Sequence, residues 1–88
     1  MLTQQVILSN KLGLHARATM KLVNTAEQFK SDITICFQNR CVDARNILDL
    51  MTLGASCGSP LEMKVSGIDE TQALDGVLKL IEERFDEE

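Results

Sequence analysis

The chain has 88 residues, 44% of them hydrophobic, and a net charge of -4 at pH 7. This length fits a single domain over residues 1–88 with one aliphatic core. The acidic balance argues against nucleic-acid binding, which needs a basic surface. No stretch approaches the roughly 20 apolar residues of a membrane span, and the first residues lack the pattern of a signal peptide. We therefore expect a cytoplasmic protein that does not insert into membranes.

Apolar and polar residues alternate in four segments, which predicts four strands, over 2–8, 32–37, 40–43 and 60–66. Apolar residues at helical spacing predict three helices, over 16–29, 46–53 and from residue 70 to Phe85. Gln38 and Asn39 fit a two-residue turn between the second and third strands. The β-α-β-β-α-β-α order predicts an α+β fold, an open-faced β-sandwich. Its four-stranded, mainly antiparallel sheet would be covered on one face by three helices.

The stretch from Gly13 to Arg17 contains the only histidine, His15, immediately before the first predicted helix. A helix start offers unpaired N–H groups and the positive end of a dipole, which together favour an anion. A neutral imidazole there is nucleophilic and can attack phosphorus to form a phosphoramidate. Arg17 adds a planar cation suited to phosphate. The alternative is a structural or surface histidine beside a solvated arginine.

The short helix over 46–53 carries five apolar residues in seven: Ile47, Leu48, Leu50, Met51 and Leu53. One interpretation is a helix wholly inside the core. The other is an exposed docking patch of Ile47, Leu48 and Met51, with Leu50 and Leu53 buried. Methionine suits such a patch because it adapts to several partner surfaces.

Three cysteines, Cys36, Cys41 and Cys57, form an odd number without zinc-type spacing. We expect reduced thiols, because the cytoplasm is a reducing compartment. If Gln38 and Asn39 form the turn, Cys36 and Cys41 oppose each other, and a redox pair is the alternative. No metal-ligand cluster or cofactor motif is present.

Two further patterns lie near the C-terminus. Asp69, with Gln72 three residues later, fits the N-cap and capping box of the third helix. The acidic residues that follow predict a solvated helix end; they are Glu82, Glu83, Asp86, Glu87 and Glu88.

The run Gly13-Leu14-His15-Ala16-Arg17 resembles the active-site signature of the HPr phosphocarriers of the bacterial phosphoenolpyruvate-dependent sugar phosphotransferase system. The resemblance extends over the whole chain, including the stretches 44–48 and 53–55. It implies a monomeric phosphoryl carrier, not an enzyme, that needs no cofactor or metal. The phosphoryl group would come from phosphorylated enzyme I, sit on Nδ1 of His15, and pass to an enzyme IIA domain.

The resemblance also implies roles for other residues. Arg17 and the backbone N–H groups of Ala16 and Arg17 would hold the phosphate. Together with the docking interpretation of the short helix, we expect partners to dock on five side chains: Ile47, Leu48, Met51, Thr52 and Lys21. Two positions depart from the family pattern. Ala18 replaces a usual proline, which should loosen the helix start slightly. Asn46 replaces the regulatory serine of many relatives, so serine phosphorylation should be absent, and Asn46 is expected to be an N-cap. The alternative function is a regulatory protein that signals by its phosphorylation state without sugar transport.

Overall fold

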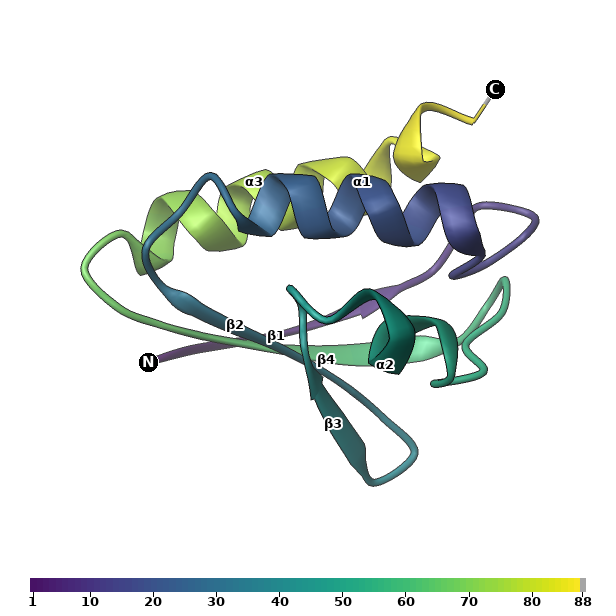
Figure 1. The fold of residues 1–88 in the computed structure, drawn as a ribbon, viewed down its shortest axis with the longest axis horizontal. Coiled ribbons are helices and arrows are strands. Elements are labelled where there is room, and N and C mark those ends of the chain that lie inside the picture. The colour runs from purple at the N-terminus through teal and green to yellow at the C-terminus, as the bar shows by residue number, and fades with distance from the viewer. Residues whose placement is uncertain (88) are drawn as a thin grey trace.

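The computed structural model describes residues 1–87 (Figure 1). Its elements are β1 (Leu2–Ile7), α1 (Ala16–Ala26), β2 (Asp32–Phe37), β3 (Arg40–Asp43), α2 (Ile47–Met51), β4 (Pro60–Ser66), α3 (Glu70–Glu82) and the 3₁₀ turn η1 (Arg84–Asp86). The predicted order of strands and helices is confirmed. Within residues 1–87, no helix combines the length and apolar character needed to cross a membrane.

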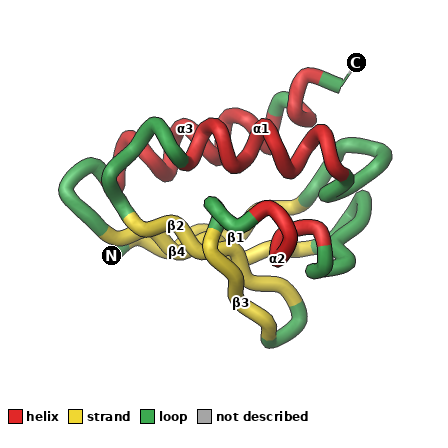
Figure 2. Tube along the Cα trace, viewed as in Figure 1, coloured by secondary structure: helices red, strands yellow, loops and turns green. Residues whose placement is uncertain are grey.

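The four strands form one sheet in the spatial order β1-β4-β2-β3. Every neighbouring pair is antiparallel, as the predicted topology requires. Helices α1 and α3 lie side by side over one face of this sheet, and α2 lies near β3 and the first half of α1 (Figures 1 and 2). The open-faced α+β arrangement is therefore confirmed.

The core forms between this sheet face and the helices. Successive side chains of a strand point to opposite faces, so Ile33 and Ile35 of β2 point inward together with alternate residues of β4. All of these inward residues are at most 1% exposed. The helices contribute their apolar faces, chiefly Leu22 of α1 and Val77 and Ile81 of α3.

Helix α1 is shorter than predicted, because it ends at Ala26 and not near Phe29. The N–H of Phe29 bonds the Ala26 carbonyl, only three residues back. Arg45 stabilises this end, since its Nη2 donates to the carbonyls of Ala26, Phe29 and Ser31 at 3.1, 2.8 and 2.8 Å. A distant side chain thus binds the last carbonyl of α1 and two carbonyls of the connection that follows it.

The predicted capping box at α3 is wrong. Asp69 is the N-cap residue, but its side chain makes no cap hydrogen bond. Glu70 reaches back instead, and its Oε1 accepts from the Gly67 N–H at 3.2 Å. The Asp69 carboxylate turns away toward the α1–β2 connection.

There the Asp69 carboxylate accepts from the N–H groups of Lys30 and Ser31, both at 2.9 Å, and from the Ser31 hydroxyl. These hydrogen bonds, the Ser31 hydroxyl first, hold the pKa of Asp69 below its usual 3.8. A carboxyl group whose pKa is lower in the folded protein than in the unfolded chain stabilises the fold at pH values above the unfolded-state pKa. This stabilisation is lost as the pH falls through the folded-state pKa.

We expect Asp69→Asn to lower the Tm by several degrees at pH 7, with the difference shrinking in acid. Thermal melts from pH 7 to pH 2 check this, with Asp75→Asn on the exposed side of α3 as the control.

The last predicted helix also ends early. Helix α3 stops at Glu82, and Arg84, Phe85 and Asp86 adopt φ values of 57°, 55° and 58°. Phe85 is fully buried, as its helical spacing predicted, but it reaches the core from a reversed backbone. The expected solvated tail is therefore wrong at Glu87, which folds back over the molecule; Glu88 lies outside the described residues.

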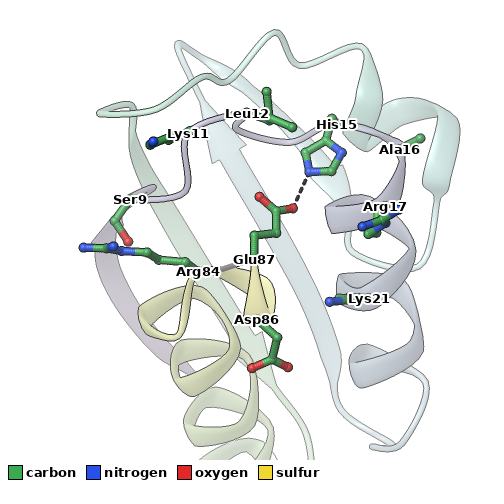
Figure 3. A pocket seen from close by; sticks show the side chains of 10 residues that line it. All are labelled: Ser9, Lys11, Leu12, His15, Ala16, Arg17, Lys21, Arg84, Asp86 and Glu87. Atoms are coloured by element: carbon green, nitrogen blue, oxygen red, sulfur yellow. Dashed lines mark hydrogen bonds and ion pairs between the residues drawn. The ribbon is translucent and has the colours of Figure 1, made fainter.

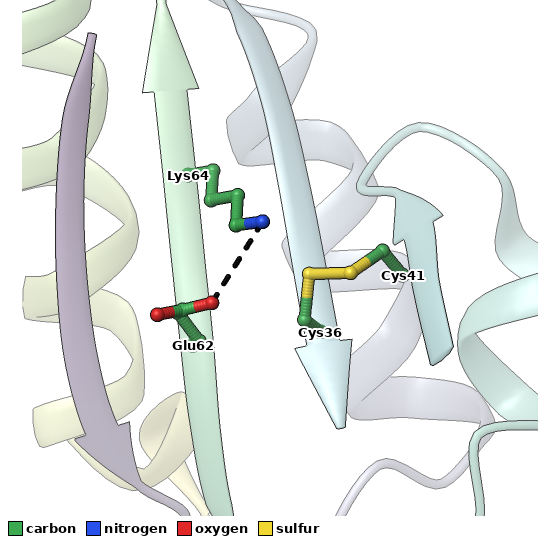
Figure 4. Close-up of a disulfide and its surroundings, with 4 residues drawn as sticks. All are labelled: Cys36, Cys41, Glu62 and Lys64. Atoms are coloured by element: carbon green, nitrogen blue, oxygen red, sulfur yellow. Dashed lines mark ion pairs between the residues drawn. A yellow bond between two sulfur atoms is a disulfide. The ribbon is translucent and has the colours of Figure 1, made fainter. Parts of the chain in front are cut away.

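Gln38 and Asn39 have φ values of 49° and 67°, so the predicted two-residue turn is confirmed. Cys36 and Cys41 face each other across this hairpin and are joined by a disulfide (Figure 4). The expectation of three reduced thiols is corrected, because direct opposition on neighbouring strands brings the two sulfurs together. Cys57 is free and exposed.

Candidate functional site

The loop before α1 is held rigidly from two sides. Buried Asn10 donates from Nδ2 to the Gly13 carbonyl at 2.7 Å, and the Leu14 N–H donates to the Ala55 carbonyl at 3.1 Å. Gly13 has φ +64°, and a Cβ there would lie 2.6 Å from the Ala55 carbonyl oxygen and from Ser56 Cα. Only glycine fits this contact between the β1–α1 and α2–β4 loops, and the contact sets where the next residues lie.

We expect Gly13→Ala to destabilise the protein by about 2 kcal/mol or more, since a left-handed alanine alone costs roughly 1 kcal/mol and the backbone clash adds to it. Urea unfolding measures the change. Gly54→Ala is the matched control, because Gly54 has φ +76° but a Cβ at that position would meet nothing within 4 Å. Equal losses in the two variants would contradict the close-contact argument.

His15 is the N-cap of α1, with extended backbone at φ -89° and ψ 178°, as the sequence predicted. Its side chain makes no cap hydrogen bond and is 27% exposed. The N–H groups of Ala16 and Arg17 have no partner within the helix, as in any first turn. The first turn of α1 contains no acidic residue, so no side chain of the helix itself neutralises the positive end of its dipole.

The imidazole lies in a groove of about 810 Å³ formed by the β1–α1 loop, the start of α1 and the C-terminal turn (Figure 3). Six charged side chains line it: Lys11, Arg17, Lys21, Arg84, Asp86 and Glu87. Four are cations and two are acids, so the groove carries a local positive charge on an acidic protein. Such a groove suits an anionic group.

The side chains of Arg17 and Lys21 differ in their exposure and in their contacts with the rest of the protein. Arg17 is exposed and has neither a hydrogen bond nor an ion pair with residues 1–87. Its guanidinium is therefore available to an incoming phosphate. Lys21 is half-buried, and its Nζ donates to the Phe85 carbonyl of the C-terminal turn. Lys21 thus anchors the tail of the chain in this structure.

Glu87 is the site residue that sequence reasoning missed. Its carboxylate bonds Nε2 of His15 through Oε2 and accepts from Asn10 Nδ2 through Oε1 at 3.2 Å (Figure 3). Burial alone would raise the pKa of Glu87, but hydrogen bonds from His15 and Asn10 and the nearby charges outweigh burial and hold the pKa below 4.5. Glu87 is therefore ionised at neutral pH.

Helix α2 lies beside α1 and exposes three of its apolar residues. Ile47, Leu48 and Met51 are 36%, 70% and 42% exposed, whereas Leu50 and Leu53 are buried. These residues are exposed as the docking-patch interpretation requires, and a helix wholly inside the core is excluded; the docking role itself stays a prediction. Exposed Leu12 and Met20, which the sequence patterns did not assign to the surface, belong to the segments on either side of His15.

Two further predicted residues lie at the ends of α2, Asn46 as its N-cap and Thr52 as its C-cap. Asn46 caps the helix, since its side-chain oxygen accepts from the Asp49 N–H at 3.1 Å, as predicted. Thr52 is exposed at the other end, where its hydroxyl donates to the Asp49 carbonyl.

Within residues 1–87, no group of three or more acidic, histidine or cysteine side chains is arranged to hold a metal ion.

Comparison with known proteins identifies the class of this fold and site. The sequence pattern described as "PTS HPr component phosphorylation site" matches residues 2–83. Phosphocarrier protein HPr of Xylella fastidiosa (strain 9a5c) is 43% identical, covering 100% of this chain and 99% of the relative. Phosphocarrier protein NPr of Shewanella violacea is 38% identical, covering 98% and 94%. The crystal structure of HPr-C-His from Thermoanaerobacter tengcongensis superimposes with a TM-score of 0.96 at 38% identity, covering 100% and 99%.

The fold and these relatives define a phosphoryl carrier of the phosphotransferase system. The chain belongs to the HPr family.

Proposed function

We propose that His15 carries the phosphoryl group, accepting it from phosphorylated enzyme I and passing it to an enzyme IIA domain. The observation that supports this most is the position of the imidazole at the N-cap of α1, two residues before Arg17, which has no hydrogen bond or ion pair with residues 1–87. Nε2 is engaged by Glu87, and the other ring nitrogen, Nδ1, lies on the side of Ala16 and Arg17 (Figure 3). A phosphoryl group on Nδ1 would meet the helix N–H groups and the Arg17 guanidinium.

The protein would act as a stoichiometric carrier in the cytoplasm, and each transfer would occur inside a transient complex with a partner protein. Docking would use the apolar side chains of α2, Ile47, Leu48 and Met51, with Thr52 at their edge. Arg17 would steer acidic partner surfaces toward the site, with Lys21 adding positive charge to the groove. We propose a monomer as the working form, although one relative from Thermoanaerobacter tengcongensis is described as an HPr dimer.

Incubation with enzyme I and phosphoenolpyruvate labelled in its phosphate tests the carrier role. We expect one labelled phosphate per chain, stable in base and labile in acid, because a phosphoramidate hydrolyses in acid. Addition of an enzyme IIA domain should then remove the label from the chain. Label that is stable in acid, or no label at all, would rule out a phosphohistidine intermediate.

A further inference from the structure

The C-terminal turn brings the Glu87 carboxylate to Nε2 of His15, at the edge of the ring away from the proposed phosphate site on Nδ1. After α3, three residues in succession adopt left-handed backbone, Arg84, Phe85 and Asp86, and this reverses the chain. None is glycine, so each such conformation costs free energy. Burial of the Phe85 side chain and the bond from Lys21 to the Phe85 carbonyl offset this cost. The reversal thus has a structural anchor one residue before Asp86 and two before Glu87.

Glu87 is held there by two donors. Its Oε1 accepts from Asn10 Nδ2 at 3.2 Å, and its Oε2 bonds Nε2 of His15. Asn10 is 1% exposed and also donates to the Gly13 carbonyl, so the carboxylate is tied to the same loop that positions His15. The contact therefore joins two partly buried side chains, His15 and Glu87, to the buried Asn10.

The ionised carboxylate can only accept hydrogen bonds, whereas a neutral imidazole has one N–H donor and one acceptor nitrogen. A bond between Glu87 and Nε2 therefore requires the proton on Nε2 and leaves the lone pair on Nδ1. We propose that Glu87 is a positioning residue for phosphoryl transfer, which holds His15 in the tautomer whose free lone pair is on Nδ1. This inference rests on the proposed role of His15 as the acceptor.

Phosphoryl transfer to Nδ1 requires no proton transfer. The Nδ1 lone pair attacks phosphorus, the N–P bond forms, and the bond from phosphorus to the donor atom breaks with its electron pair leaving on the donor. The proton stays on Nε2, and the positive charge that develops on the ring is balanced by the Glu87 carboxylate. When the phosphoryl group passes on to the acceptor, the Nδ1–P bond breaks, and the ring protonated on Nε2 is a good leaving group.

Among the charged side chains of the groove in residues 1–87, Glu87 is the one that bonds the His15 ring. Arg17 is exposed and has no hydrogen bond or ion pair with residues 1–87, and Lys21 bonds a backbone carbonyl. Lys11, Arg84 and Asp86 line the groove, but none of them bonds the imidazole in the described part of the chain. In Figure 3 only the Glu87 side chain is directed at the ring.

The test compares the free proteins by ¹⁵N NMR of the His15 ring, at a pH at which the signals show neutral imidazole. In the unchanged protein we expect a single tautomer protonated at Nε2. Glu87→Ala should shift the ring nitrogens toward a mixture of tautomers. Glu87→Gln should lie between, because its amide oxygen accepts without charge. Glu83→Gln, an exposed acid on the same tail, is the control and should leave the signals unchanged.

Phosphorylation by enzyme I supplies the second measurement. We expect Glu87→Ala to lower the initial rate about 10-fold, the low end of the range for loss of a group that orients a functional histidine, and Glu83→Gln to leave it unchanged. Unaltered ring signals in Glu87→Ala would overturn the positioning role even if the unchanged protein is phosphorylated normally. Failure of the unchanged protein to be phosphorylated would instead overturn the proposed function, and the NMR result would still report the tautomer.

Discussion

His15→Ala is expected to abolish phosphoryl acceptance from enzyme I. Within residues 1–87 the groove offers no second imidazole, and alanine removes both the nucleophile and the ring that Glu87 holds. Loss of a covalent nucleophile lowers a rate by several orders of magnitude, about 10⁴-fold or more. The measurement is incorporation of labelled phosphate after a fixed time with excess enzyme I.

The variant should remain folded, which keeps the result interpretable. The His15 side chain makes no cap hydrogen bond, so its removal costs α1 no helix-capping interaction. We expect the free energy of unfolding to change by about 1 kcal/mol or less, typical of a partly exposed polar position. Base-stable, acid-labile label on a folded His15→Ala protein would place the acceptor elsewhere. His15→Gln, with a longer polar side chain, serves as a second inactive variant.

Local sequence patterns were sufficient to predict the sheet and the position of His15. The alternation of Ile33 and Ile35 with polar residues fixed the inward face of β2, because strand side chains alternate whatever their surroundings. Gln38 and Asn39 marked the turn because they are the two residues that separate the strand patterns, and asparagine favours the positive φ of a two-residue hairpin. His15 could be placed at a helix start because the apolar helical spacing begins just after it.

The same reasoning failed where a distant group decides the structure. Asp69 looks like a capping-box residue, but the N–H groups near Ser31 offer its carboxylate more donors than its own helix does. Phe85 has helical spacing from Ile81, and it is buried as that spacing predicts. Its backbone, however, is no longer helical. Glu87 looked solvated within an acidic run. Its bond to His15 depends on the chain reversal at residues 84–86, which no local pattern predicts.

The exposed apolar face of α2 gives the second large expected effect. Met51→Glu is expected to weaken transfer by 10- to 100-fold at low protein concentration, through loss of docking. Central apolar residues of an interface contribute about 1–3 kcal/mol each, and a buried carboxylate facing an acidic partner adds repulsion. Met51 is 42% exposed, so the substitution should leave the fold intact.

The measurement separates docking from chemistry. Initial rates over a range of Met51→Glu concentrations should show a higher KM for the carrier with a largely unchanged maximal rate, because His15 and Arg17 are untouched. Ile68→Glu is the matched control: Ile68 is 90% exposed in the β4–α3 connection. Helix α3, 13 residues or about 20 Å long, separates that connection from the tail at His15. Equal losses in the two variants would mean that added negative charge, and not the face of α2, weakens the encounter. A fall in maximal rate alone would place Met51 in the transfer step instead of the docking surface.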